Sequence, residues 1–234
     1  GRAGQTECGG WVYMPAKRNL KFLLLRLFYH LRGLKAMFWV PMVGMNVLLP
    51  LLNYRSFLKA GADELALLPQ EFHRLMAVTA PVLCVWWVLF VLREYVEPDG
   101  AEVLYACPAR QKIGDALALF LLFLADMSVI YAVYIHFFPE MRRSFYMLLC
   151  VCAFVFGLSF LLMFLTKSVT VTLMVVLLYV IISIVFMDGK NIVPFYSANN
   201  IAPVNLLKEF YLPLACGGIL LSAGGMVLNQ RKVI

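Results

Sequence analysis

Long apolar runs separated by short polar breaks make up most of the chain, and they predict helices that cross a membrane. A bilayer core of about 30 Å needs roughly 20 mostly apolar residues per helix, because backbone groups find no water there. The runs are uninterrupted, whereas the strands of a membrane barrel alternate apolar and polar residues. The pattern predicts an all-α polytopic membrane protein with six transmembrane helices, at residues 36–54, 75–92, 116–138, 145–166, 169–187 and 212–228.

An amphipathic helix is predicted before the first of these spans. Apolar residues recur at helical spacing from Leu20 to Leu34, while most basic residues lie off this stripe. We favour an anchor that lies on the membrane surface, although a merely solvated basic lead-in fits the same pattern. The basic positions of this surface helix are Lys17, Arg18, Lys21, Arg26, Arg32 and Lys35.

The chain divides into a short N-terminal segment and one long domain. Residues 1–13 match neither a signal peptide nor the segment that follows, and a basic stretch begins directly after Met14. We expect residues 1–13 to be an extension or disordered, and residues 14–234 to form a single transmembrane domain.

Composition supports the membrane class and orients the spans. The chain is 63% hydrophobic and 14% charged, with a net charge of +7. Such an excess of Lys and Arg in a membrane protein marks the cytoplasmic boundary rather than a nucleic-acid site. With both termini in the cytoplasm, 12 Lys and Arg residues fall on the cytoplasmic side and seven on the outer side. The cytoplasmic set includes Arg93, Arg110, Lys112 and Lys167. We expect an integral protein of a bacterial cytoplasmic membrane.

The region between the fifth and sixth spans, residues 188–213, is too apolar for a free loop. We expect it to lie against the outer membrane face as short helical pieces broken at Pro194, Pro203 and Pro213. In the sixth span Gly218, Ser222 and Gly225 recur at i, i+4 and i+7, which lets helices approach closely. We prefer packing to a substrate role for these small residues.

Motifs for catalysis, cofactors and metals are missing from the sequence. No nucleotide-binding phosphate loop, HExxH helix or GxSxG elbow is present, so we expect no catalytic, cofactor-binding or metal-binding residues in this chain. The three histidines, His30, His73 and His136, fall at or outside the predicted membrane boundaries, which disfavours a haem between spans. The six cysteines contain no CxxC pair and are interpreted as small apolar residues of the spans.

One acidic residue, Asp126, falls deep inside a predicted span. A carboxylate near the bilayer centre costs several kcal/mol unless it is paired, protonated or facing water, so such residues often line transport pathways. A protonated Asp126 that hydrogen-bonds a serine or tyrosine hydroxyl of a neighbouring helix, of the kind Ser128 represents, fits equally well. The two interpretations stay open.

The polar insert between the second and third spans, residues 97–115, predicts a short helix. Pro98 suits a first helical position, and acidic residues gather at the positive end of the helix. Val103, Leu104 and Cys107 give it an apolar side, and Pro108 ends it. Such a helix packs on lipid headgroups or docks into a groove on a soluble partner.

The insert resembles the signature between the second and third spans of ABC-2 type permeases, the membrane subunits of one class of ABC transporters. The matching positions are Glu97, Gly100, Glu102, Leu104, Pro108, Arg110 and Ile113. The resemblance extends over nearly the whole chain after Met14, and includes the connecting helix, six spans and an outer broken hairpin. Ala101 and Asp115 depart from the family, where Thr and Lys are common.

The resemblance implies a coupling helix at the insert that docks on a separate ATPase, which binds the ATP and Mg, and a permease that works as a homodimer or heterodimer. Since the spans offer no polar pocket, we expect an amphipathic or hydrophobic cargo, such as a peptide, drug or lipid. The resemblance implies that this cargo is exported. Two alternatives remain: an ion-coupled carrier or channel that uses Asp126, and a non-transporting membrane anchor or assembly subunit.

Overall fold

The computed structural model describes Leu25, Phe28, Tyr29 and residues 31–59, 68–96, 109–185 and 195–231. Helices account for nearly all of these residues. The first span consists of α2 (Ala36–Val43), the π-helical turn η1 (Gly44–Leu48) and α3 (Leu49–Lys59). The following helices are α4 (Leu68–Val96), α6 (Ala109–Phe137), α7 (Met141–Thr166), α8 (Val169–Val185), α9 (Val204–Leu206), the π-helical turn η3 (Leu207–Tyr211) and α10 (Leu212–Arg231).

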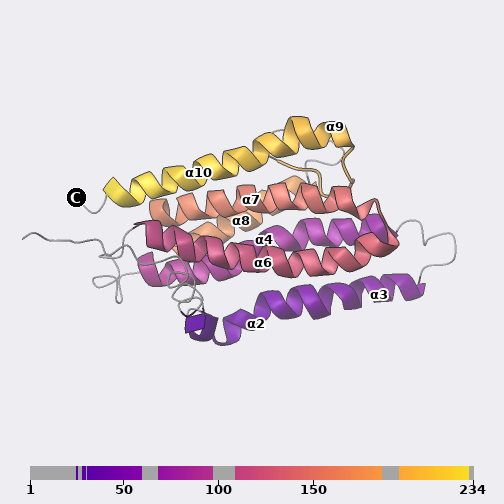
Figure 1. Cartoon of the computed structure of the whole chain (residues 1–234), viewed down its shortest axis with the longest axis horizontal. Helices are drawn as coiled ribbons and strands as arrows, with labels where there is room; N and C mark the ends of the chain where they lie inside the picture. Colours follow the sequence, from indigo (N-terminus) through magenta and orange to yellow (C-terminus); the bar gives the residue numbers. More distant parts are fainter. Residues whose placement is uncertain are drawn as a thin grey trace, which may run out of the picture.

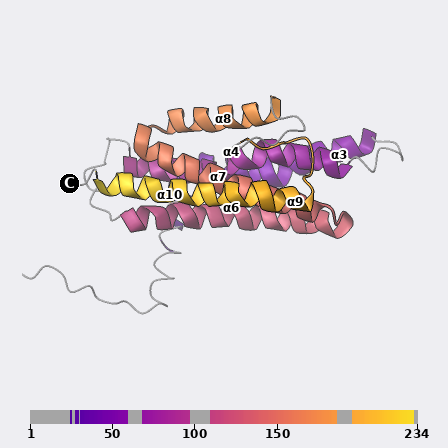
Figure 2. The same ribbon diagram turned by 90° about the horizontal axis from the view of Figure 1, so that it is seen from above.

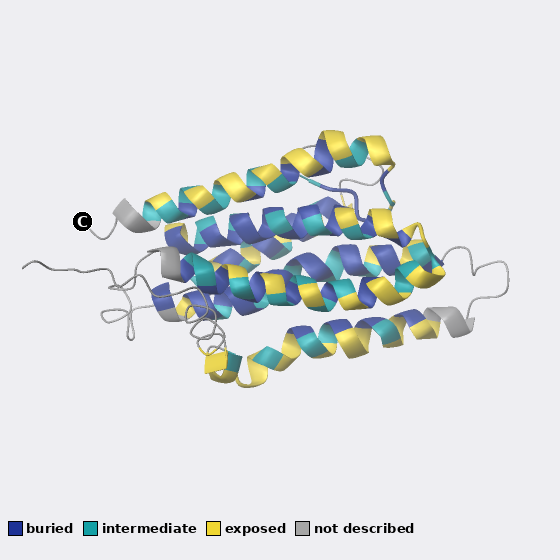
Figure 3. Cartoon of the chain, in the orientation of Figure 1, coloured by how far each residue is buried: buried dark blue, intermediate teal, exposed yellow. Residues whose placement is uncertain are grey.

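Successive helices alternate in direction and form a bundle with α4 and α7 at its centre. α7 packs most extensively on α10, while α4 contacts α6, α7, α8 and the first span. Figure 1 shows α10 and the first span on opposite sides of this centre, and Figure 2 shows α8 and α6 on the other two sides. In the most apolar stretches of α4 and α7, 61% of the residues are buried, against 22% in the first and last spans. The outer helices therefore leave wide apolar faces uncovered by this chain (Figure 3).

The prediction of a helical protein with several membrane-spanning candidates is confirmed, whereas the exact number of spans stays a prediction. Five helices are long and apolar enough to cross a membrane, and α8 is a shorter apolar helix of 17 residues. At 1.5 Å per residue α8 is about 25 Å long, near the lower limit for a span. Several helices extend beyond their predicted ends, and α4 begins at Leu68 rather than at residue 75. Hydropathy marks only the apolar part of a helix, whereas backbone hydrogen bonds continue through its polar ends.

Prolines shape the helices without always ending them. Pro203 precedes α9 with an extended backbone, as the predicted break requires. The predicted break at Pro213 is wrong, because the helix runs on from η3 into α10. Each π-helical turn ends two residues before a proline, at Leu48 before Pro50 and at Tyr211 before Pro213. Since proline lacks an N–H and its ring displaces the carbonyl four residues earlier, a wider turn lets the helix continue.

Small residues allow the closest helix contact, between α7 and α10. A Cβ on Gly157 would lie 1.9 Å from the carbonyl oxygen of Gly218, and a Cβ on Gly218 would lie 2.4 Å from that of Ala153. Gly225 meets Phe160 in the same interface. The packing role predicted for Gly218 and Gly225 is confirmed, and Gly157 is its unpredicted counterpart on α7. Membrane helices associate through such backbone contacts because lipid gives no hydrophobic drive to bury side chains.

Replacing Gly218 with alanine should destabilise the protein by about 1–3 kcal/mol, because the added methyl overlaps the α7 backbone. Thermal unfolding in detergent measures the effect. Gly217→Ala is the matched control, since a Cβ at this neighbouring position would lie 3.9 Å from the Phe154 ring, an ordinary contact. Equal melting temperatures for the two variants would contradict the interface.

Candidate functional site

In the sequence, the predicted coupling residues from Glu97 to Pro108 follow the last residue of α4 and precede the first residue of α6. Glu97, Gly100, Glu102, Leu104 and Pro108 fall outside the described residues. Arg110 belongs to the first turn of α6, but its side chain is also outside the description. The structure does describe the helix ends that carry the segment, and these ends lie on the same side of the bundle as the last residues of α10 (Figure 1).

A buried polar cluster joins these two helix ends. The Tyr95 hydroxyl of α4 donates a hydrogen bond of 2.7 Å to Oδ2 of Asp115 on α6. The Lys112 ammonium lies 5.8 Å from the centre of the Tyr95 ring, in cation-π range. Lys112 is 1% exposed and Asp115 is 6% exposed. Buried charged groups are costly to separate from their partners, so this cluster fixes the spacing of the two chain ends that flank residues 97–108.

The cluster gives Asp115 a structural role. Asp115 departs from the family pattern, where a lysine is common, yet here its carboxylate is the acceptor that links α6 to Tyr95. Lys112 lies one helical turn earlier on the same face. In the sequence, Lys112 and Asp115 look like ordinary charged residues at the end of a membrane span. Tyr95 is 20 residues away from Asp115, so no local pattern indicates their contact.

The predicted surface helix is described only in part. Arg32 and Lys35 of the predicted surface helix are exposed, while Lys17, Arg18, Lys21 and Arg26 lie outside the described residues. The described part of the segment is helical at residues 31–33, and Leu34 is buried against the core. The side chains of Leu25, Phe28 and Tyr29 are 54%, 59% and 61% exposed. The membrane-surface role of the helix stays a prediction.

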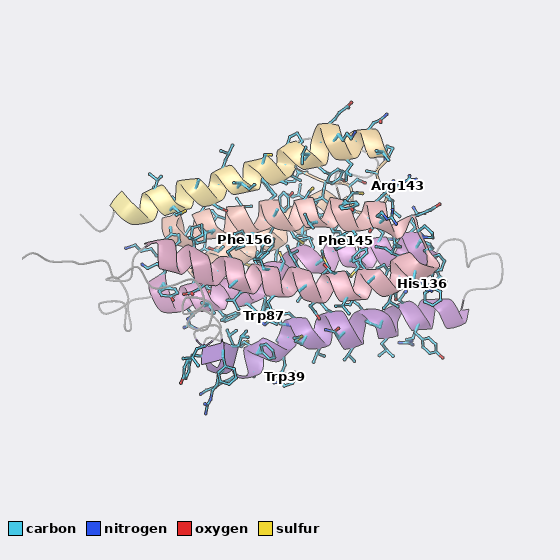
Figure 4. All side chains as sticks on the ribbon, in the orientation of Figure 1. Trp39, Trp87, His136, Arg143, Phe145 and Phe156 are labelled. Atoms are coloured by element: carbon cyan, nitrogen blue, oxygen red, sulfur yellow. The ribbon has the colours of Figure 1, made fainter. Side chains whose placement is uncertain are left out.

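Two tryptophans attach the first span to α4. Pro41 has no N–H, so the carbonyl of Met37 four residues earlier loses its helical partner. The Trp86 indole donates to this carbonyl at 3.2 Å, and the Trp87 indole donates to the Phe38 carbonyl at 3.1 Å. Trp87 also stacks on Phe38 with ring centres 5.4 Å apart. The first span is thereby fixed to α4 near the end where Trp39 and Trp87 lie in Figure 4.

Asp126 meets an amide rather than a hydroxyl. Asn46, in the π-helical turn of the first span, donates to both carboxylate oxygens of Asp126 at 3.1 and 3.2 Å, and also to the Met42 carbonyl. The predicted hydrogen bond to a neighbouring helix is present, but the predicted type of partner is wrong. Ser128 instead donates to the Leu124 carbonyl of its own helix.

A second hydrogen bond from a side-chain amide lies further along the first span and α6. Asn53 donates to the Tyr134 hydroxyl at 2.7 Å. The first span is therefore attached to α6 by Asn46 and Asn53 and to α4 by the tryptophans. Asp126 is partly exposed and Asn46 is exposed, so this intramembrane polar pair lies at the edge of the bundle rather than in its packed centre.

At the opposite end of the bundle, residues 195–203 fold onto α4. Pro81 frees the carbonyl of Ala77, and the Tyr196 hydroxyl donates to it at 2.6 Å. Burial raises the pKa of Tyr196 well above its ordinary range, so this hydroxyl stays a neutral donor. Gln70 donates to the Asn199 carbonyl and to the Asn200 side chain, both at 3.2 Å. The described part of this region thus packs on the bundle, and its position against the outer membrane face stays a prediction.

A buried hydrogen-bonded group lies beneath this outer segment. Ser144 Oγ lies 2.6 Å from Nδ1 of His73 and 2.8 Å from the Tyr131 hydroxyl. His73 is fully buried within α4, about a turn and a half after the helix begins, where α6 and α7 contribute its polar neighbours. Its position at or outside a membrane boundary stays a prediction. Polar groups in such surroundings need partners, and Ser144 supplies one.

The described residues contain no group of three or more His, Cys, Asp and Glu side chains that could hold a metal ion. Comparisons with protein-family models, with curated proteins and with solved structures find no match for this chain. The functional argument therefore depends on the residues themselves.

Replacing Asn46 with leucine should destabilise the protein by about 1–3 kcal/mol, because the Asp126 carboxyl group would lose its donor from the first span. Adding Asp126→Leu should recover most of the loss, since the remaining polar group is then removed. Unfolding of both single variants and the double variant in detergent measures this coupling. Strictly additive effects would show that the two side chains act independently.

Tyr95→Phe should lower the free energy of unfolding by about 1–2 kcal/mol, because the buried Asp115 carboxylate would lose a hydrogen bond. Tyr146→Phe serves as the control, since Tyr146 is 48% exposed on α7. A loss of stability in the control as large as in Tyr95→Phe would argue against a special role for the cluster.

Proposed function

We propose that this chain is the membrane-spanning permease subunit of an ATP-driven ABC transporter, in which a separate ATPase binds ATP and Mg. Residues 97–108 form the docking segment for that ATPase. The chain works as a homodimer or heterodimer in the bilayer and exports an amphipathic or hydrophobic substrate such as a peptide, drug or lipid. It has no hydrolytic activity of its own.

The observation that supports this proposal most is the buried Tyr95, Asp115 and Lys112 cluster. A polar insert that only connects two helices does not need a buried cluster that links the two helix ends. A segment that receives force from a partner needs one, because movement reaches the bundle only if the helix ends move with the segment. The cluster joins both ends of residues 97–108 to each other, and α4 carries the connection onward to the first span, α7 and α8.

The distribution of basic residues supports an orientation with the docking segment in the cytoplasm. From Met14 onward, the predicted topology assigns 12 Lys and Arg residues to the side of residues 97–108 and seven to the other. Cytoplasmic segments near membrane spans carry such an excess. An ATPase in the cytoplasm would then reach the segment, and both termini would lie on that side.

An ion-coupled carrier that uses Asp126 is the second candidate, and the contact of Asp126 with Asn46 is the observation that favours it. An intramembrane carboxylate with a neutral amide partner can bind and release a proton more readily than one paired with a cation. The position of the pair at the bundle edge favours the permease instead, because a carrier site usually lies between packed or broken helices near its centre.

The double variant Glu102→Lys with Leu104→Asp should abolish co-purification of the chain with its ATPase, together with transport-linked ATP turnover. The changes reverse an acidic charge and remove an apolar contact from the docking segment. Affinity purification from cells that express both proteins, followed by ATPase assay, measures the effect. The partner to test is any phosphate-loop ATPase whose gene is found beside the gene for this chain.

Glu140→Lys with Val204→Asp is the matched control, because it makes the same two kinds of change at exposed positions on the opposite end of the bundle. The control should co-purify normally. Normal ATPase binding and turnover in the docking variant would overturn the proposal. Loss of a proton-dependent flux in Asp126→Asn without any ATPase would favour the carrier.

A further inference from the structure

An apolar groove of about 640 Å³ runs between the first span and α4. Its walls include Ala36, Trp39, Val43 and Leu48 from the first span, and Val78 and Leu83 from α4. Thr79 also lines the groove, but its hydroxyl donates to the Leu75 carbonyl of its own helix at 2.8 Å. The wall therefore suits a hydrocarbon chain rather than a polar molecule.

The groove follows from the way the first span is attached. Trp86 and Trp87 hold its beginning on α4, whereas Asn46 and Asn53 hold its later turns toward α6. The span is thus held by different neighbours at its two ends, and the groove lies along its contact with α4. Gly44 marks a close approach, since a Cβ there would lie 3.2 Å from Leu83 Cδ1.

The groove is long enough for an acyl chain of one leaflet. Its lining on the first span extends from Ala36 to Leu52, which is about 24 Å at 1.5 Å per residue. One leaflet of a bilayer core is about 15 Å thick. A chain that enters at the Ala36 end would be covered along its whole length.

Positive charge gathers where such a lipid would place its headgroup. Lys35 directly precedes Ala36, and Arg32 lies one turn earlier; both side chains are exposed. No Asp or Glu occurs between Glu7 and Asp63 in the sequence. The exposed Trp39 indole is a side chain typical of the headgroup boundary. This end of the groove therefore attracts an anionic phosphate group.

We propose that the groove binds an anionic phospholipid of the leaflet at the Ala36 end, with one acyl chain between the first span and α4 and the phosphate against Lys35 and Arg32. A neutral lipid offers the same chains but lacks the net charge that these residues attract. The lipid fills the groove and adds a contact that holds the first span against α4. This inference does not depend on a partner ATPase.

Native mass spectrometry of the full chain in detergent, with added phosphatidylglycerol or phosphatidylcholine, tests the proposal. Phosphatidylglycerol should be retained in preference to phosphatidylcholine. Lys35→Gln should lower its retention about fivefold, which corresponds to the loss of one basic contact near a membrane surface. Val43→Phe should lower the retention of both lipids, because the larger side chain fills the groove.

Two control variants separate the groove from general effects. Lys167→Gln removes an exposed lysine at the same end of the bundle, and Lys167 has a positive φ like Lys35, at 53° against 47°. Val129→Phe adds the same bulk on the exposed face of α6. Both controls should retain phosphatidylglycerol normally. Equal retention of the two lipids, equal loss in Lys167→Gln, or unchanged retention in Val43→Phe would overturn the proposal.

Discussion

The need to satisfy every backbone carbonyl in a medium without water shapes this bundle. Pro41 and Pro81 each remove the N–H that would pair with a carbonyl four residues earlier, and an aromatic donor from another element takes its place. Trp86 donates to the carbonyl freed in the first span, and Tyr196 to the carbonyl freed in α4. Such bonds are costly to leave unmade, so they attach both the first span and the outer segment to α4.

α4 is consequently the helix through which distant parts of the molecule are connected. It carries the Trp donors for the first span, the Ala77 acceptor for residues 195–203 and the Tyr95 hydroxyl for Asp115. It also packs on α6, α7 and α8. A displacement at the end that bears residues 97–108 would reach the first span and the outer segment along one continuous helix. The glycine contact of α7 with α10 leaves little freedom for independent movement there.

Much of the architecture was predictable because hydropathy acts locally. Apolar length alone gives the helical membrane class, and glycine spacing gives the α10 interface. Helix ends were less predictable, since polar residues such as Gln70 and His73 continue α4 beyond its apolar part. The partner of Asp126 was not predictable either: Asn46 is 80 residues away in sequence, and only the π-helical turn and the crossing of two spans bring them together.

The sequence by itself determined that this chain is built from helices long and apolar enough to cross a membrane, and it placed a polar insert between two of them. These properties depend on the composition of single segments, which the bilayer selects by transfer free energy. The tertiary structure alone decided which side chains meet: Tyr95 with Asp115, Asn46 with Asp126, and Trp86 with the carbonyl that Pro41 frees. The reason is that each of these hydrogen bonds joins different helices, whose crossing and rotation arise from packing rather than from any local pattern.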